Sequence, residues 1–109
     1  MIREIVFGGE KRPVKYGWSA VAELERLTGK PIDEIGSDRS AVSDSLYLIY
    51  VGLKHGARKA GKEFKLTVED IGDMLDDEDV AQISQSFAEI FNASMPQSKN
   101  VQAPGKPGR

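Results

Sequence analysis

Hydrophobic and polar positions divide the chain into a short β-type segment followed by several helix-type segments. Residues 2–16 carry β-favouring side chains on both sides of Gly8-Gly9, a pair that tolerates positive φ. This pattern predicts a β-hairpin at the N-terminus. Pro13 cannot donate a hydrogen bond to a neighbouring strand, so the second strand should lie at a sheet edge there.

Residues 16–30 predict a first helix from about Trp18 to Thr28, with apolar positions at helical spacing. Gly29 is well placed to end it in a left-handed conformation, and Pro31 prevents continuation. The side chains expected to face the core are Trp18, Leu24 and Leu27. The side chains expected on the exposed flank are Glu23 and Arg26.

A single helical turn around residues 31–35 and a long helix over residues 41–60 are expected next. The centre of the long helix, residues 46–53, is apolar almost all round, which indicates burial on more than one side. Periodicity alone would also allow a strand over residues 47–51. The length of the segment and its flanking alanine-rich turns favour a helix, which we expect to form the centre of the core.

Two further helices are predicted in the C-terminal half. Thr67 and Asp70 form a capping-box pattern that opens a helix ending near Leu75. A last helix over Val80–Ser94 has an apolar stripe formed by Val80, Ile83, Phe87, Ile90 and Phe91. The fold class is therefore α+β, mainly α, with one domain over residues 1–95. Residues 96–109 are rich in proline and glycine and predict a flexible tail.

Composition narrows the classes of function. A chain of 109 residues supports one small core, and the lack of cysteine excludes disulfides, thiolate metal sites and cysteine nucleophiles. No signal-peptide pattern is present, and no apolar run approaches the length of about 20 residues that spans a bilayer. Residues 1–94 hold 12 basic and 17 acidic residues, a net charge of −5 that disfavours general nucleic-acid binding.

No group of residues predicts catalysis, a cofactor or a metal. His55 is the sole histidine and is interpreted as a cation near a helix end, not as a catalytic base. Residues 76–79 are acidic but lack the spacing of a calcium loop, and acids suit the start of a helix. An alternative is that the acidic residues 69–79 form a surface for a basic partner.

A basic patch is predicted around Gly61, with no interleaved aromatic residues and no recognition helix. We interpret it as ordinary solvation of a helix end. Its members are Lys54, Arg58, Lys59, Lys62 and Lys65. The two helices on either side of residues 76–79 also suggest a helix-turn-helix regulator, but their exposed residues are acidic and would repel phosphates.

The order of these segments resembles the tail assembly chaperones of long-tailed bacteriophages and of related gene transfer agents. The resemblance covers residues 2–95. After the hairpin it rests on KYGWSAVAELE at residues 15–25, followed by LTGK at residues 27–30. It continues with LIYVGLKHG at residues 48–56 and LTVEDIGDML at residues 66–75. None of these stretches is a catalytic signature.

The resemblance implies a non-enzymatic protein of the host bacterial cytoplasm that is absent from the mature virion. Such proteins bind the long, helical and aggregation-prone tape measure protein, keep it soluble, and help to recruit tail tube subunits. Many are also made in a frameshifted, extended form, and self-association is a further option. The alternatives are a structural connector of the phage tail and a DNA-binding regulator. From their expected exposure, the residues proposed to contact a partner are Glu23, Arg26, Asp76, Asp77, Glu78 and Asp79.

Overall fold

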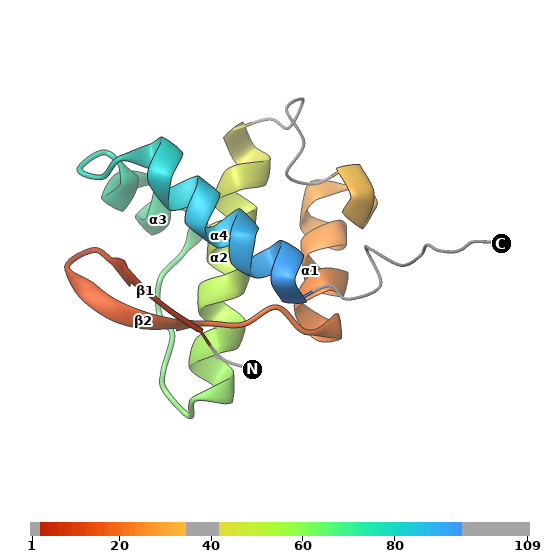
Figure 1. Cartoon of the computed structure of the whole chain (residues 1–109), viewed down its shortest axis with the longest axis horizontal. Helices are drawn as coiled ribbons and strands as arrows, with labels where there is room; N and C mark the ends of the chain where they lie inside the picture. The colour runs from red at the N-terminus through yellow and green to blue at the C-terminus, as the bar shows by residue number, and fades with distance from the viewer. Residues whose placement is uncertain (1–2, 35–41, 95–109) are drawn as a thin grey trace, which may run out of the picture.

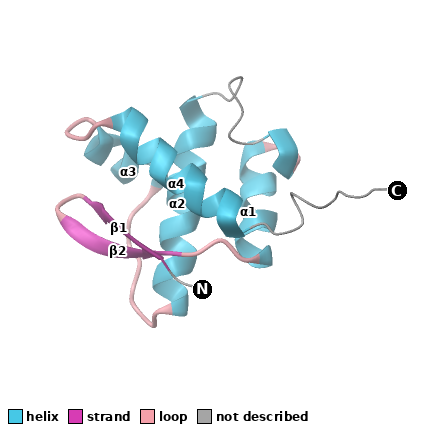
Figure 2. Ribbon diagram, viewed as in Figure 1, coloured by secondary structure: helices cyan, strands magenta, loops and turns pink. Residues whose placement is uncertain are grey.

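The computed structural model describes residues 3–34 and 42–94, and the structural statements below concern those residues. Two strands are followed by a short 3-10 helix and four α-helices, so the predicted fold class is confirmed (Figures 1 and 2). The predicted domain end at residue 95 and the tail over residues 96–109 lie outside the described residues. The elements are β1 (Arg3–Phe7), β2 (Glu10–Val14), α1 (Trp18–Thr28), η1 (Ile32–Glu34), α2 (Val42–Lys59), α3 (Val68–Leu75) and α4 (Val80–Ser94).

The predicted N-terminal hairpin is confirmed. Strands β1 and β2 pair antiparallel, with Phe7 opposite Glu10 across the turn. Gly8 and Gly9 have φ angles of 65° and 80°, a left-handed pair that suits the right-handed twist of a tight hairpin. In the described part of the chain the sheet has two strands, so Pro13 lies on an edge strand as expected.

Helix α2 is the central element, which confirms the helical interpretation of residues 41–60 and excludes the strand alternative at residues 47–51. It packs against β2, α1, α3 and α4, and Figure 1 shows it running the full height of the molecule behind α4. The predicted first residue of this helix lies outside the described residues. Its almost fully buried apolar side chains are Leu48, Ile49, Val51 and Leu53.

Two glycines on α2 let the chain between β2 and α1 approach closely. A methyl group added at Gly56 would overlap the backbone carbonyl of Pro13, and one added at Gly52 would overlap the phenol of Tyr16. The Lys15 N–H donates to the Gly52 carbonyl at 3.1 Å. The Tyr16 hydroxyl donates to the Leu48 carbonyl at 2.5 Å. These contacts fix the start of α1 beside the C-terminal half of α2.

Helix α1 has the predicted bounds, but one predicted core residue is wrong. Gly29 ends the helix with a φ of 72°, as expected. Leu24 is fully buried and Leu27 is partly buried against the core. Trp18 is instead 70% exposed, because it begins the helix and lies off the face that packs on α2.

Helices α3 and α4 also agree with the prediction. Thr67 and Asp70 form the capping box, with the Asp70 N–H donating to the Thr67 hydroxyl at 3.0 Å. Four of the five predicted stripe residues of α4 are buried, and Phe87 meets Phe7 edge-on with ring centroids 6.4 Å apart. Val80 remains 48% exposed because it opens the first turn. The predicted turn at residues 31–35 appears as η1, and its last residue is outside the described residues.

Candidate functional site

Glu23 is buried, so its predicted place on the exposed flank is wrong. Only 9% of its surface is exposed. One carboxylate oxygen, Oε1, lies 2.7 Å from Nε2 of His55, and Oε2 accepts a 2.7 Å hydrogen bond from Nζ of Lys54. The physical reason is helical spacing, because residues 20, 23, 24 and 27 form one inward stripe with Glu23 in its middle.

The Glu23 cluster is electrostatically stabilised. Burial acts to raise the pKa of Glu23, but the hydrogen bonds and charges of Lys54 and His55 outweigh burial and hold that pKa below its ordinary value. The hydrogen bond to Glu23 in turn raises the pKa of Lys54. The carboxylate therefore remains ionised and ties α1 to α2.

Ser19, His55 and Glu23 have the side-chain types of a nucleophile, a base and an orienting acid. Ser19 and His55 line the same hollow, and Glu23 holds the imidazole. Nucleophilic catalysis also needs a hydrogen bond from the serine to the base. No such bond joins Ser19 to His55 in the described part of the chain. What the contacts of Glu23 do is join α1 to α2.

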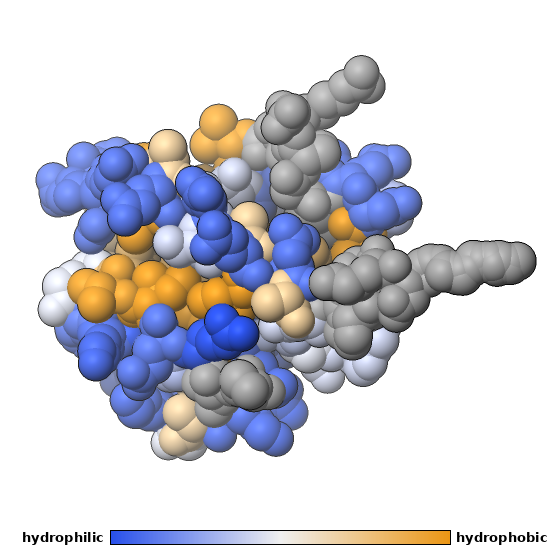
Figure 3. All heavy atoms as spheres, in the orientation of Figure 1, coloured by the Kyte–Doolittle hydropathy of each residue, from blue (hydrophilic) through white to orange (hydrophobic). Residues whose placement is uncertain are grey.

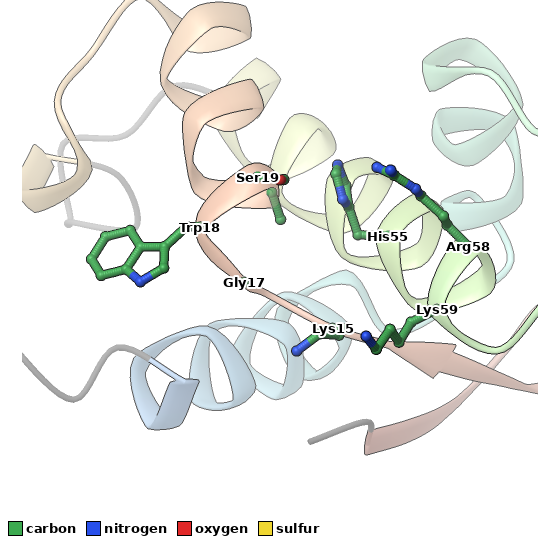
Figure 4. Close-up of a pocket in the computed structure, with 8 residues that line it drawn as sticks. Lys15, Gly17, Trp18, Ser19, His55, Arg58 and Lys59 are labelled. Atoms are coloured by element: carbon green, nitrogen blue, oxygen red, sulfur yellow. The ribbon is translucent and has the colours of Figure 1, made fainter.

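Beside this cluster lies the hollow drawn in Figure 4, which we call the basic hollow. It has a volume of about 600 Å³ and lies between the start of α1 and the C-terminal turns of α2. Among the described residues that line it, none is acidic. Its polar lining side chains are Lys15, Ser19, His55, Arg58 and Lys59. Trp18 also lines it, but its indole points outward, away from the cations (Figure 4).

Four members of the predicted basic patch, Lys54, Arg58, Lys62 and Lys65, line a second hollow together with Tyr50 and Phe64. The prediction that no aromatic residue lies among these cations is therefore wrong.

The members of the patch also differ in their partners. Lys54 pairs with Glu23, and its ammonium lies 5.6 Å from the ring centroid of Tyr50. Lys65 forms an exposed pair with Glu63 at 3.5 Å. Arg58 and Lys59 line the basic hollow together with Lys15, a residue that the prediction did not include. Gly52 and Gly56 were the sequence signal that could have predicted this position of Lys15, because glycines at these positions of α2 allow the chain near Lys15 to pack closely.

The acidic residues predicted to contact a partner lie in the connection between α3 and α4. Asp76, Asp77 and Asp79 are exposed and Glu78 is half-buried. Glu78 accepts a 3.2 Å hydrogen bond from the Gly8 N–H, which ties the connection to the hairpin turn. Asp79 caps α4 by accepting a 3.2 Å hydrogen bond from the Gln82 N–H. Both acids have structural roles, and the role of Asp79 is the one that helix-start chemistry predicts.

The other predicted contact residue, Arg26, is exposed in the last turn of α1. It belongs to a different element from the acidic connection, and Glu23 is removed from the surface by burial. The predicted contact residues therefore form no single site in the described part of the chain.

An apolar band crosses one face of the molecule between the hairpin and α4 (Figure 3). Strand β1 packs against α4. On this strand Ile5 is partly buried against the core, and Val6, on the opposite face, is 60% exposed. Since the described sheet has two strands, the outer edge of β1 carries no further strand. The band is thus an apolar surface next to an open strand edge.

The described residues hold no group of three or more histidines, aspartates or glutamates placed to bind a metal ion. Within the same ranges, none of the helices is both long and apolar enough to cross a bilayer. No protein-family model, curated protein sequence or solved structure matches this chain.

Proposed function

We propose that this chain is a non-enzymatic binding module that keeps a helical, aggregation-prone partner soluble. In the terms of the family that it resembles, this partner is a tape measure protein, and the chain is a tail assembly chaperone. Recruitment of tail tube subunits and release before the virion is complete belong to the same proposal. The observation that supports it best is the apolar band beside β1.

The exposed face of β1 is surplus to the core of the domain. Phe7, Phe87 and Leu24 are fully buried, so the core is closed without Val6. A valine on an edge strand with 60% of its surface exposed therefore remains available to another chain. An amphipathic helix can place its apolar face along such a surface and cover it from water.

The two alternatives have less support. A helix-turn-helix regulator would need a surface around α3 and α4 that attracts phosphates, whereas Asp76, Asp77 and Asp79 are exposed between those helices. A connector that stays in the particle remains the second candidate within the same class of binding proteins. The two roles differ in where the protein is found after assembly, which purified virions would reveal by mass spectrometry.

Co-expression tests the proposal directly. The chain is produced together with a fragment of a tape measure protein, and the soluble fraction of that fragment is measured with and without the chain. We expect the fragment to become soluble and to copurify. Val6→Glu should reduce copurification, because it replaces the exposed apolar side chain of β1 with a charge.

Val42→Glu is the matched control, since Val42 is 79% exposed at the start of α2, an element outside the band. Equal copurification by both variants would show that the exposed face of β1 at Val6 is not the contact surface. A folded chain that leaves the fragment insoluble would contradict the chaperone proposal itself.

A further inference from the structure

We infer that the basic hollow is a docking site for an acidic, amphipathic protein segment, with carboxylates bound by Lys15, Arg58 and Lys59 and an apolar side chain placed on Trp18. This surface is distinct from the apolar band. The inference stands independently of the tail-assembly proposal and can be tested without a tape measure protein.

The three cations of the basic hollow lack charge compensation in the described part of the chain. Lys15, Arg58 and Lys59 form no ion pair with any described residue, although the chain has more acidic than basic residues. The basic side chains that do form pairs in the described part include Lys30 with Asp44 and Lys54 with Glu23. Three unpaired cations in one hollow repel one another, and an anionic ligand would relieve that repulsion.

Solvation of a helix end explains only part of the hollow. Arg58 and Lys59 lie in the last turn of α2, where cations complement the negative end of the helix. Lys15 comes from the connection between β2 and α1, and the packing of that connection on Gly52 holds it there. The start of α1 adds partial positive charge from its peptide dipoles, and Gly17 provides no side chain that caps its N–H groups. The negative end of α2 is already occupied by Arg58 and Lys59, and the end of α1 is positive, so neither helix end compensates the charge of Lys15.

Trp18 provides the second type of contact. It is the sole tryptophan of the chain, it is 70% exposed, and it lines the same hollow. Tryptophan and arginine are the side chains most often found at energetic centres of protein interfaces. Because the indole points away from the three cations (Figure 4), a bound segment would meet the cations with acidic residues on one face and the ring with an apolar residue beyond that face.

A protein segment fits this surface better than a nucleic acid does. Single-stranded nucleic acids bind to rows of aromatic rings with free faces. The aromatic pair Tyr50 and Phe64 has ring centroids 5.8 Å apart, and Lys54 lies over the Tyr50 ring. A long polyanion would also meet the net negative charge of the remaining surface, whereas a short acidic segment would not.

The test uses a labelled synthetic peptide with glutamate on one face of a helix and leucine on the other. Binding is measured by fluorescence anisotropy at low salt. Trp18 emission provides a second, label-free signal. We expect the double variant Arg58→Gln, Lys59→Gln to bind the peptide about tenfold more weakly than the wild type. Trp18→Ala should weaken binding by about tenfold as well, and added salt should weaken binding to the wild type.

The matched control is the double variant Arg3→Gln, Lys11→Gln, which removes the same charges from exposed hairpin positions. It should bind the peptide like the wild type. A peptide with glutamine in place of glutamate should not bind. Equal binding by both double variants, or failure of the wild type to bind the acidic peptide, would overturn the inference. Tighter binding of an oligothymidylate than of the peptide would also overturn it in favour of a nucleic-acid surface.

Discussion

The Oε1 atom of Glu23 on α1 lies 2.7 Å from Nε2 of His55 on α2, with both side chains almost removed from solvent. Oε2 of the same carboxylate accepts a hydrogen bond from Lys54 on the neighbouring position of α2. One acidic side chain thus joins the first helix to the central helix through two bonds. The same tie fixes the orientation of His55 at the wall of the basic hollow.

Replacing Glu23 should destabilise the fold. Glu23→Gln keeps the size of the side chain but removes the charge that faces Lys54 and His55. We expect the free energy of unfolding to fall by about 1.5–3 kcal/mol, the range for hydrogen bonds to charged groups. Urea unfolding followed by circular dichroism measures it. Glu4→Gln, on an exposed position of β1, is the control and should change stability by less than about 0.5 kcal/mol. A loss as small as that of the control would contradict a role for Glu23 in stability.

The same carboxylate should make stability depend on acidity. The pKa of Glu23 is lowered in the folded state, so its contribution is fully present above its unfolded pKa of about 4.3. That contribution is lost as the pH falls through the lower, folded pKa, because the unfolded state takes up the proton first. The difference in unfolding free energy between wild type and Glu23→Gln should therefore shrink below about pH 4. A difference that stays constant from pH 7 to pH 3 would contradict this assignment.

Much of the fold could be predicted from the sequence because its local signals agree with its packing. The glycine pair of the hairpin, Gly29 and the capping box at Thr67 each determine a local conformation that the tertiary structure retains. The central position of α2 followed from an apolar segment too wide for a single buried face.

The errors arose where a residue's type suggested a different environment from its position. Glu23 occupies a core position of α1, and its burial depends on two partners that are 31 and 32 positions away in sequence. Trp18 is apolar, yet it precedes the inward stripe. The basic hollow could not be predicted from the sequence, because Lys15 and Lys59 are far apart in the chain. They line the same hollow only because β2 packs on α2.

The hydroxyl of Tyr16 offers a separate test of the junction between β2 and α1. It is buried and donates to the Leu48 carbonyl, so Tyr16→Phe should lower the free energy of unfolding by about 1 kcal/mol. Tyr47→Phe, at a half-buried position of α2, should have a smaller effect. Urea unfolding of both variants at pH 7 would decide it, and equal losses would contradict the prediction.

Tyr16 should also limit stability in alkali. Burial raises its pKa well above the ordinary tyrosine value of about 10. Above that ordinary value the unfolded state loses the phenol proton while the folded state retains it, so stability falls as the pH rises. Tyr16→Phe should weaken this alkaline loss, measured as the change in urea midpoint between pH 9 and pH 11. An unchanged alkaline loss in Tyr16→Phe would show that other groups cause it.

A steric effect on folding is expected at Gly56. In most exposed helix interiors, replacing glycine with alanine stabilises a protein by about 0.5–1 kcal/mol. At Gly56 the added methyl would meet the Pro13 carbonyl, a backbone group that cannot turn aside as a flexible side chain can. We therefore expect Gly56→Ala to destabilise the protein by about 1–3 kcal/mol, the usual cost of overpacking.

Gly72 in α3 is the matched control for Gly56. Its nearest neighbours to an added methyl are the Leu46 methyl groups at 4.0 Å, which is an ordinary contact. Gly72→Ala should therefore raise the midpoint of thermal unfolding while Gly56→Ala lowers it. Opposite shifts would support the close approach of β2 to α2 that holds Lys15 beside Arg58. If Gly56→Ala is as stable as Gly72→Ala, that approach is absent in solution, and the basic hollow loses the packing that forms it.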